Sequence, residues 1–331
     1  MRLLVTGATG FIGRTLVLRA LGDGRIGEVI APVRSAEKLR AQLAREGVVN
    51  PPKLNILEAT APDWDFRALG KVDRVVHCAG VLFGRSREEY FRVNVDGTLR
   101  LLETVEGAPK TVLLSSQSAG GPTPAGQTAR RIGDGDRPIS WYGESKLRME
   151  SAVREMAPQF PVLLLRAPMV LGPGDQATLP LFRMVRGFVW PKPGFKSKHF
   201  SWISSDDLVD AIQAWFERGP EISPFTANVT SPGTITDRDL MQTAARVSKR
   251  QGLALPVPQA ALRLVALASK VIPAIGENVP SLTPDRAREI WPNRWVLDAR
   301  PFEEATGWRG SANFEDTLAR TLAWFRREGL V

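Results

Sequence analysis

Residues 2–13 read RLLVTGATGFIG, and this stretch decides the fold class of the chain. A short apolar run, Arg2–Thr6, leads directly into a glycine-rich turn and then into a helical pattern at Ile12–Leu21. Glycines at such a turn let the backbone approach a pyrophosphate, and the following helix offers free N–H groups and a partial positive charge. The turn therefore predicts dinucleotide binding, with a tight turn of purely structural purpose as the alternative. The predicted contacts are Gly7, Thr9, Gly10, Phe11, Ile12 and Gly13.

Short apolar runs alternate with longer helical patterns in the first half of the chain, which is typical of β-α-β units. The predicted strands are Arg2–Thr6, Glu28–Val33, Lys53–Leu57, Arg74–His77, Thr111–Ser115 and Val162–Arg166. The predicted helices are Ile12–Leu21, Ala36–Glu46, Glu88–Val105 and Trp141–Met156. We expect an α/β fold, a Rossmann-type doubly wound parallel sheet, over residues 1–167.

The alternation stops after Ala167, where proline and glycine become frequent. Residues 168–331 are expected to form a smaller, mainly helical C-terminal substrate-binding lobe, with the chain crossing back to the sheet near 200–230. Its predicted helices are Asp206–Glu217, Asp237–Lys249, Pro258–Ile272, Pro284–Ile290 and Phe314–Glu328, and its predicted strands are Phe200–Ile203 and Ala227–Val229.

Composition narrows the class of protein. The chain has 331 residues, and 43% of them are hydrophobic, which is enough for a sizeable core. A single cysteine excludes an intramolecular disulfide, and two histidines leave little for a metal site, so no metal is expected. The net charge of +9 favours anionic ligands, although the basic residues are mostly scattered. No nucleic-acid recognition motif, apolar run of spanning length or leader segment is evident, so we expect a cytoplasmic protein with neither a nucleic-acid partner nor a membrane span.

The end of the second predicted strand bears on the choice of dinucleotide. An acidic side chain there would accept hydrogen bonds from a ribose 2′-hydroxyl, whereas a guanidinium matches a 2′-phosphate. Arg34 and Ser35 stand at this point. They predict NADP(H) as the preferred cofactor, with NAD(H) as the alternative; an ordinary solvated charge at Arg34 is the other interpretation.

A tyrosine and a lysine lie one helical turn apart at Tyr142 and Lys146. A phenol with a pKa near ~10 is a poor acid or base at neutral pH, but an adjacent ammonium stabilises the phenolate and lowers that pKa. Such a pair is common by chance. Here, however, the strand Thr111–Ser115 ends in further hydroxyls, Ser116 and Ser118, at the sheet edge where α/β folds bind ligands.

Together these features resemble the short-chain dehydrogenase/reductase superfamily, specifically its extended branch of NAD(P)-dependent epimerases, dehydratases and 3β-hydroxysteroid-dehydrogenase-like reductases. The resemblance covers nearly the whole chain. The segments similar to family motifs are Thr6–Gly13, His77–Gly80, Val93–Thr98, Arg166–Asp175 and Ile203–Leu208.

The resemblance implies roles for individual residues. Tyr142 would be the general acid or base at a carbonyl or alcohol oxygen, Lys146 would tune it and hold the nicotinamide ribose, and Ser116 would polarise the same oxygen. Asn94 would support a proton relay, or act in helix capping or packing. The segments beside the cofactor would contribute Cys78, Ala79, Gly80, Pro168 and Val170.

Two departures from the family pattern bear on the chemistry. Residues 119–122 read AGGP where the family often has Val-Tyr-Gly, so Ser118 remains an alternative to Ser116 as the active-site hydroxyl. Gln117 and Ser118 stand where dehydratases carry an Asp-Glu pair, which argues against water elimination.

Substrate identity is expected to lie in the second lobe, because the sheet positions only the cofactor. Aromatic residues between Phe182 and Trp202 form either an apolar cleft wall, which makes these two residues substrate contacts, or the core of the lobe. The interleaved cations face either an anionic group or solvent; they are Arg183, Lys192, Lys196 and Lys198. The apolar segment 258–272 is interpreted as a packed helix or a lid over a lipophilic substrate.

These observations favour an NADP(H)-dependent oxidoreductase that interconverts a ketone and a secondary alcohol on a mostly apolar small molecule. The alternatives are a nucleotide-sugar epimerase with a tightly held cofactor and a cofactor-binding regulator without turnover. Members of the family often dimerise through the helices corresponding to Glu88–Val105 and Trp141–Met156, so the resemblance also implies a homodimer.

Overall fold

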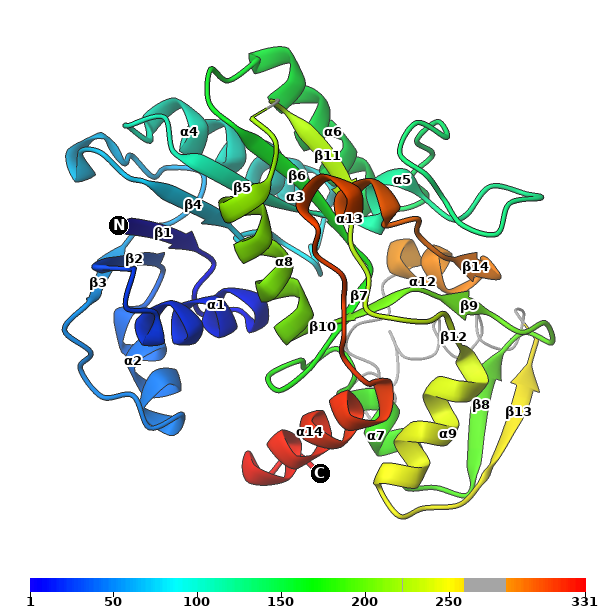
Figure 1. The fold of residues 1–331 in the computed structure, drawn as a ribbon. Helices are drawn as coiled ribbons and strands as arrows, with labels where there is room; N and C mark the ends of the chain where they lie inside the picture. The colour runs from blue at the N-terminus through cyan, green and yellow to red at the C-terminus, as the bar shows by residue number, and fades with distance from the viewer. Residues whose placement is uncertain (222, 259–283) are drawn as a thin grey trace.

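The computed structural model describes residues 1–221, 223–258 and 284–331, and its centre is a seven-stranded parallel sheet (Figure 1). The strand order is β11-β6-β5-β4-β1-β2-β3. The first six strands along the chain are β1 (Arg2–Thr6), β2 (Glu28–Val33), β3 (Leu54–Glu58), β4 (Arg74–His77), β5 (Lys110–Ser116) and β6 (Val162–Ala167). The order reverses between β1 and β4, which is the point where doubly wound sheets bind ligands. The predicted fold class is confirmed.

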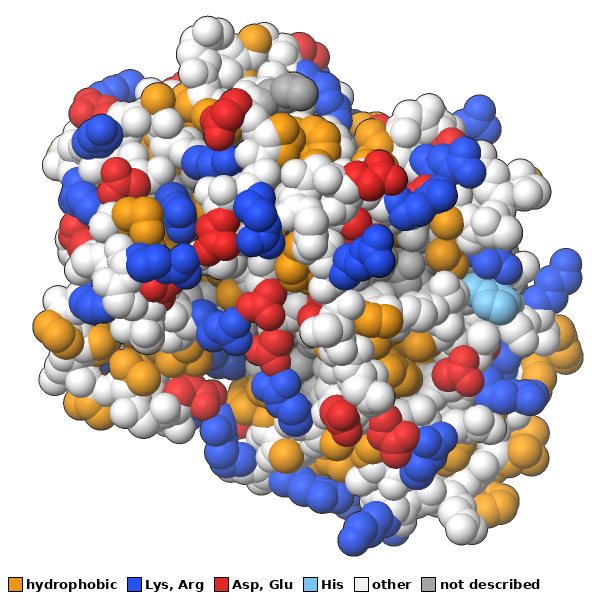
Figure 2. All heavy atoms as spheres, in the orientation of Figure 1, with side chains coloured by type: hydrophobic (Ala, Val, Ile, Leu, Met, Phe, Trp, Pro, Cys, Tyr) orange, Lys and Arg blue, Asp and Glu red, His pale blue; other side chains and the backbone are white. Residues whose placement is uncertain are grey.

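Basic and acidic side chains are interspersed over much of the face seen in Figure 2. Within the described ranges, no helix is long and apolar enough to cross a bilayer.

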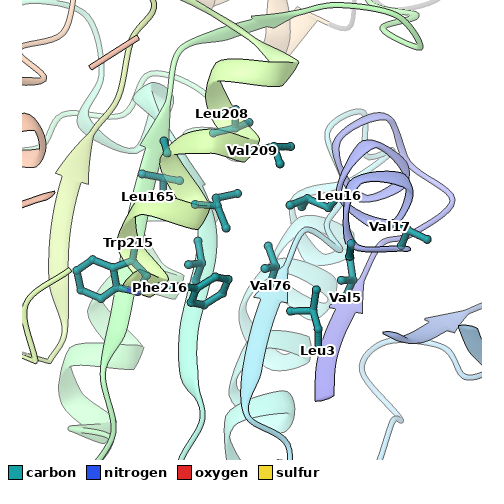
Figure 3. Packing of buried hydrophobic residues seen from close by; sticks show 14 of the residues in the cluster. Leu3, Val5, Leu16, Val17, Val76, Leu165, Leu208, Val209, Trp215 and Phe216 are labelled. Carbon is teal, nitrogen blue, oxygen red and sulfur yellow. The ribbon is translucent and has the colours of Figure 1, made fainter. Parts of the chain in front are cut away.

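Helices cover both faces of this sheet because its strands are apolar on both sides. Leu3 and Val5 of β1 point to the face covered by α1 (Phe11–Gly22), α2 (Ala36–Arg45) and α8 (Ser205–Arg218). Figure 3 shows this face, with Leu16 and Val17 of α1 and Phe216 of α8 packed over the strands. Leu4 points the other way, into a second core with α4 (Gly97–Thr104) and α6 (Trp141–Met156).

The helix predicted at Glu88–Val105 is not continuous. The structure has α3 (Arg87–Phe91), a π-helical turn at Arg92–Asp96, and then α4. The apolar spacing is nearly the same on either side of such a turn, so the hydrophobic pattern cannot reveal it. Turns of this kind are often found at functional sites.

The second half of the chain has a core of its own. It is built from α7 (Leu179–Met184), α9 (Asp237–Val247) and α14 (Phe314–Arg327). Three small sheets accompany these helices: β7 (Met169–Leu171) with β10 (Trp202–Ser204); β8 (Val189–Pro193) with β13 (Leu253–Val257); and β12 (Ile235–Thr236), β9 (His199–Phe200) and β14 (Arg294–Trp295). The predicted strand Phe200–Ile203 is therefore split between two sheets, which is a correction.

Between residues 205 and 228 the chain returns to the large sheet. Helix α8 packs on it, and β11 (Phe225–Asn228) pairs with β6 as the edge strand. The helix α12 (Pro284–Ile290) is confirmed, and α13 (Arg300–Thr306) was not predicted. The helix predicted at Pro258–Ile272 lies outside the described residues from position 259 onward. The boundary between 1–167 and 168–331 stays a prediction.

Candidate functional site

The glycine turn after β1 packs tightly against the loop after β4. Gly7 has a φ of +71°, and a Cβ at this position would lie 2.7 Å from the backbone nitrogen of Ala79. A Cβ at Gly13 would collide with the carbonyl oxygen of Gly7. Helix α1 begins at Phe11 with no side-chain cap from Gly10, so its first N–H groups are left for a ligand. The turn is thus shaped for an anionic group close to the backbone.

A chain of hydrogen bonds holds the carboxyl ends of β1 and β4 together. The N–H of Ala79 donates to Thr6 Oγ1, which lies 2.7 Å from Nδ1 of His77. On the other side, Nε2 of His77 lies 3.0 Å from Thr98 Oγ1, which donates to the carbonyl of Asn94. Because the Thr98 hydroxyl uses its hydrogen on Asn94, it must accept from His77, so a neutral His77 carries its proton on Nε2. Burial lowers the pKa of His77 to about 3, with a further contribution from Lys146.

Asn94 lies in the π-helical turn and joins three segments of the site. Its Oδ1 accepts the N–H of Val81 at 2.7 Å, and its Nδ2 donates to the Val81 carbonyl and to Ser145 Oγ. Ser145 lies on α6 between Tyr142 and Lys146. Asn94 is buried, with 1% of its surface exposed, so it holds the loop after β4 against α6.

Buried charges fix α6 on the sheet. The guanidinium of Arg166, on β6, donates to both carboxylate oxygens of Glu150 on α6, at 2.9 and 2.6 Å. It also donates to both oxygens of Asp136, and Ser115 Oγ donates to Glu150. Near the start of α6, Gly143 packs against the carbonyl of Ser118 so closely that a Cβ would collide with it. The helix therefore has little freedom to shift along the sheet.

Lys146 is buried at the edge formed by β4 and β5. Its Nζ donates to the carbonyl of Leu114 at 2.9 Å, and a Cβ at Gly80 would lie 3.5 Å from it. Burial lowers the pKa of Lys146 to about 8, against smaller raising effects of Cys78 and Glu150. Burial also raises the pKa of the half-buried Cys78 to about 12, so its thiol stays protonated at neutral pH.

Tyr142 lies in the first turn of α6, one turn before Lys146. Ser140 caps this helix by accepting the N–H of Gly143. The ring of Tyr142 is half-buried, with its centroid 6.2 Å from that of Tyr90, whose hydroxyl donates to the carbonyl of Leu82. The phenol therefore rests against a buried aromatic neighbour on one side.

Two buried serines, Ser116 and Ser118, lie at the end of β5 and just beyond it. Ser116 Oγ accepts the N–H of Ser118 as the cap of the short helix α5 (Gln117–Gly120). In the part of the chain that the structure describes, the Ser116 hydroxyl has no acceptor for its own hydrogen, which leaves it able to donate to a ligand oxygen. Oε1 of Gln117 is buried, and the described residues offer it no donor.

Arg34 and Ser35, the two residues expected at the adenosine ribose, differ in their hydrogen bonding within the protein. Ser35 Oγ caps α2 by accepting the N–H of Lys38. Arg34 is exposed at the end of β2, and none of the described side chains pairs with it. Its guanidinium is therefore available to an external anion near the glycine turn.

Comparison with known proteins identifies the family. Residues 3–227 match the model of the NAD dependent epimerase/dehydratase family. The chain belongs to this family. Its members include NAD(P)-dependent dehydrogenases and epimerases acting on CH–OH groups, and this chain is an enzyme of that extended short-chain dehydrogenase/reductase type.

Two curated relatives of this epimerase/dehydratase family match almost end to end. The chain is 28% identical to a ceramide reductase from Caulobacter vibrioides, with 98% of this chain and 94% of the relative covered. It is 26% identical to a decarboxylating sterol-4-alpha-carboxylate 3-dehydrogenase from Saccharomyces cerevisiae, with 99% and 98% covered. The structure of MoeE5 in complex with UDP-glucose and NAD has a TM-score of 0.75 at 22% identity and covers 99% of both chains, which shows the shared fold.

The residues after β6 that were expected beside the cofactor pack into the fold. Pro168 is buried directly beyond the strand, and Val170 pairs with Ile203 between β7 and β10. Farther on, Gly174 packs against Arg14 of α1, whose guanidinium lies 5.6 Å from the ring centroid of Trp324 on α14. This contact could not be predicted from local sequence patterns, because the three segments are far apart along the chain.

The aromatic residues expected at the substrate are buried in the lobe. Phe182 and Trp202 are each 1% exposed and pack against Phe325 and Phe314, respectively. The core interpretation fits them, and their assignment as substrate contacts is corrected. Lys192 and Lys198 are also buried; Lys192 pairs with Asp237 at 3.1 Å, and Lys198 donates to the carbonyl of Trp291. Of the four cations predicted to face an anionic group or solvent, only Arg183 and Lys196 are exposed.

In residues 1–221, 223–258 and 284–331, no group of three His, Cys, Asp or Glu side chains is arranged so that it could hold a metal ion. The described residues do bring together the glycine turn, Asn94, Ser116, Tyr142 and Lys146 at the carboxyl edge of one sheet.

Sequence reasoning missed Asp285 and Glu289 of α12, which contact the start of α6.

Proposed function

We propose that this enzyme is an NADP(H)-dependent oxidoreductase that interconverts a ketone and a secondary alcohol on a mostly apolar small molecule. The observation that carries the proposal is the buried Lys146 ammonium at the edge of β4 and β5, one helical turn from Tyr142. Ser116, whose hydroxyl hydrogen has no acceptor among the described residues, lies at the end of β5.

The residues present fit a dinucleotide cofactor. A Cβ at Gly7 or Gly13 would collide with neighbouring backbone, so glycines keep this turn tight, and the start of α1 offers N–H groups to a pyrophosphate. Arg34, whose guanidinium no described side chain pairs, is suited to a ribose 2′-phosphate, which favours NADP(H) over NAD(H). When bound, the cofactor would supply or accept a hydride.

The chain's own residues handle the proton. In the reductive direction Tyr142 gives its phenolic proton to the substrate oxygen as the alcohol forms. Ser116 donates a hydrogen bond to the same oxygen and helps to place it. The Lys146 ammonium stabilises the phenolate that remains, and its buried position strengthens this interaction. Asn94 acts as a positioning residue through Val81 and Ser145.

The apolar substrate is inferred from the relatives. The ceramide reductase and the sterol-4-alpha-carboxylate 3-dehydrogenase bear the names of lipid-directed enzymes and match this chain over nearly their whole length. Gln117 and Ser118 occupy the positions of the dehydratase acids, so water elimination is not proposed.

A nucleotide-sugar epimerase is the second candidate, favoured by a 28% identity to an uncharacterised UDP-glucose epimerase from Bacillus subtilis over 69% of this chain. The two functions separate in one assay. The purified enzyme is given NADPH with hydrophobic ketones, including a 3-ketosteroid and a long-chain 3-ketoamide, and separately UDP-glucose without added cofactor. Oxidation of NADPH by a ketone supports the proposal. Inversion of the sugar by protein that already carries NAD(H) overturns it.

A further inference from the structure

Among the residues that the structure describes, none packs on one face of the two-stranded sheet of β8 and β13. Exposure alternates along β8 and over the first three residues of β13, and the register pairs Val189 with Leu253 and Pro191 with Leu255. These four residues are exposed, whereas Trp190 and Lys192 of β8 are buried against the lobe. A solvent-facing sheet side normally carries polar residues, yet every residue on this side is apolar.

Two aromatic residues extend this side. Phe188 is 72% exposed just before β8, and Phe195 is 74% exposed in the turn after it. We call this surface the apolar flap face. It consists of Phe188, Val189, Pro191, Phe195, Leu253 and Leu255. It lies at the outer end of the lobe, far from the large sheet (Figure 1), and Figure 2 shows hydrophobic side chains at the lower right rim, over β8 and β13.

The two stretches of sequence that carry the apolar flap face are basic. Residues 176–205 and 240–258 contain basic side chains but no aspartate or glutamate. Two of these cations are buried, and Arg246 pairs with Glu315. The others are exposed, and none of the described acidic groups pairs with them; they are Arg183, Arg186, Lys196, Lys249 and Arg250. Arg246, Lys249 and Arg250 line a shallow depression of about 520 Å³ that also includes Gly252, the residue before β13.

We propose that the apolar flap face docks the enzyme on the surface of an anionic lipid membrane. Projecting aromatic side chains can enter the boundary between headgroups and acyl chains, while lysine and arginine side chains contact lipid phosphates. The charge favours an anionic surface over a neutral one. The large exposed side chains stand on a two-stranded flap at the edge of the molecule, which suits shallow insertion. This inference is independent of the proposed reaction.

Vesicle sedimentation of the full chain tests the inference. Wild type is expected to sediment with vesicles of phosphatidylcholine and phosphatidylglycerol in equal parts, and weakly with phosphatidylcholine alone. The variant Phe188→Ser/Phe195→Ser removes the aromatic side chains, and Lys249→Glu/Arg250→Glu reverses two charges. Each is expected to bind the anionic vesicles at least about tenfold less tightly. Because all four side chains are exposed, thermal stability should stay unchanged.

Matched controls are Val49→Ser and Arg40→Glu, which change an exposed apolar and an exposed basic residue near the other end of the molecule. Both should bind like wild type. The inference is overturned if wild type ignores anionic vesicles or if the flap variants bind as tightly as the controls. It is also overturned if light scattering shows a dimer that Phe188→Ser/Phe195→Ser dissociates, because a second copy would then cover this face.

Discussion

The carboxylate of Asp285 accepts the backbone N–H of Trp141, with its two oxygens 2.9 and 3.0 Å from the nitrogen. Trp141 is the first residue of α6 and directly precedes Tyr142. Glu289, one turn later on α12, accepts the hydroxyl of Ser140, the capping residue of α6. A segment from the end of the chain thus fixes the start of the helix that carries the proposed catalytic tyrosine.

Removal of this contact should lower turnover more than stability. Asp285→Ala is expected to cost about 1 kcal/mol of unfolding free energy, as for other lost helix caps, and to reduce kcat while leaving the Kd for NADP unchanged. Asp285→Asn keeps an acceptor and should recover most of kcat. Asn313→Ala removes the cap of α14, which carries none of the proposed catalytic residues, so it should cost similar stability without affecting kcat. Equal kcat in Asp285→Ala and wild type would contradict the positioning role.

The buried His77 predicts an acid-dependent loss of stability. Its pKa is about 3 in the folded protein against 6.5 as the ordinary value, so between these limits the unfolded chain binds a proton that the folded chain does not. The contribution of neutral His77 to the free energy of unfolding is present above pH 6.5 and decreases as the pH falls. Between pH 7 and pH 5 this group should lower the free energy of unfolding by about 2 kcal/mol. Urea unfolding at both values measures it. His77→Asn should show a smaller pH effect, whereas His199→Asn, at the half-buried histidine of β9, should keep the wild-type effect. If His77→Asn lost as much free energy of unfolding between pH 7 and pH 5 as wild type does, this explanation would be refuted.

The Arg166–Glu150 pair predicts an asymmetric mutational response. Glu150→Leu leaves a buried guanidinium with Asp136 as its remaining carboxylate partner and should cost about 3 to 5 kcal/mol. Adding Arg166→Met should restore much of this loss. On the exposed side of α6, Arg148 and Glu155 lie 3.0 Å apart, and Glu155→Leu should cost less than about 1 kcal/mol. Chemical denaturation compares the four proteins, and similar losses at positions 150 and 155 would be inconsistent with a buried network.

Arg34 predicts the cofactor preference. Arg34→Ala removes a charge-assisted contact to the 2′-phosphate, so KM for NADPH should rise roughly 10- to 100-fold while KM for NADH changes little. Arg40→Ala, at an exposed arginine of α2, serves as the control and should leave both values unchanged. A parallel rise for both dinucleotides would show that Arg34 does not read the phosphate.

Local signals in the sequence predicted the sheet and much of the site. The glycine turn, the strand ends and the Tyr142–Lys146 spacing each lie within one short segment, and the parallel sheet brings those segments to one edge. Contacts between distant segments could not be predicted. The pairing of β8 with β13 and the cap from Asp285 depend on the folded arrangement of the lobe.

Composition also left some side chains ambiguous. The aromatic residues between 182 and 202 read alike in the sequence, yet Phe182 and Trp202 are core residues while Phe188 and Phe195 are exposed. The pattern at 88–105 predicted one helix because a π-helical turn adds a residue without disturbing the apolar spacing noticeably. In both cases packing decides the outcome.

Turnover and cofactor binding by Tyr142→Phe test the central claim most directly. The variant loses only the phenolic hydroxyl, so the Kd for NADP should stay within about twofold of wild type, while kcat on the best ketone falls by a factor of about 10² to 10⁴. Such a split would support proton transfer by Tyr142 beside a bound dinucleotide. Wild-type turnover in Tyr142→Phe would contradict it.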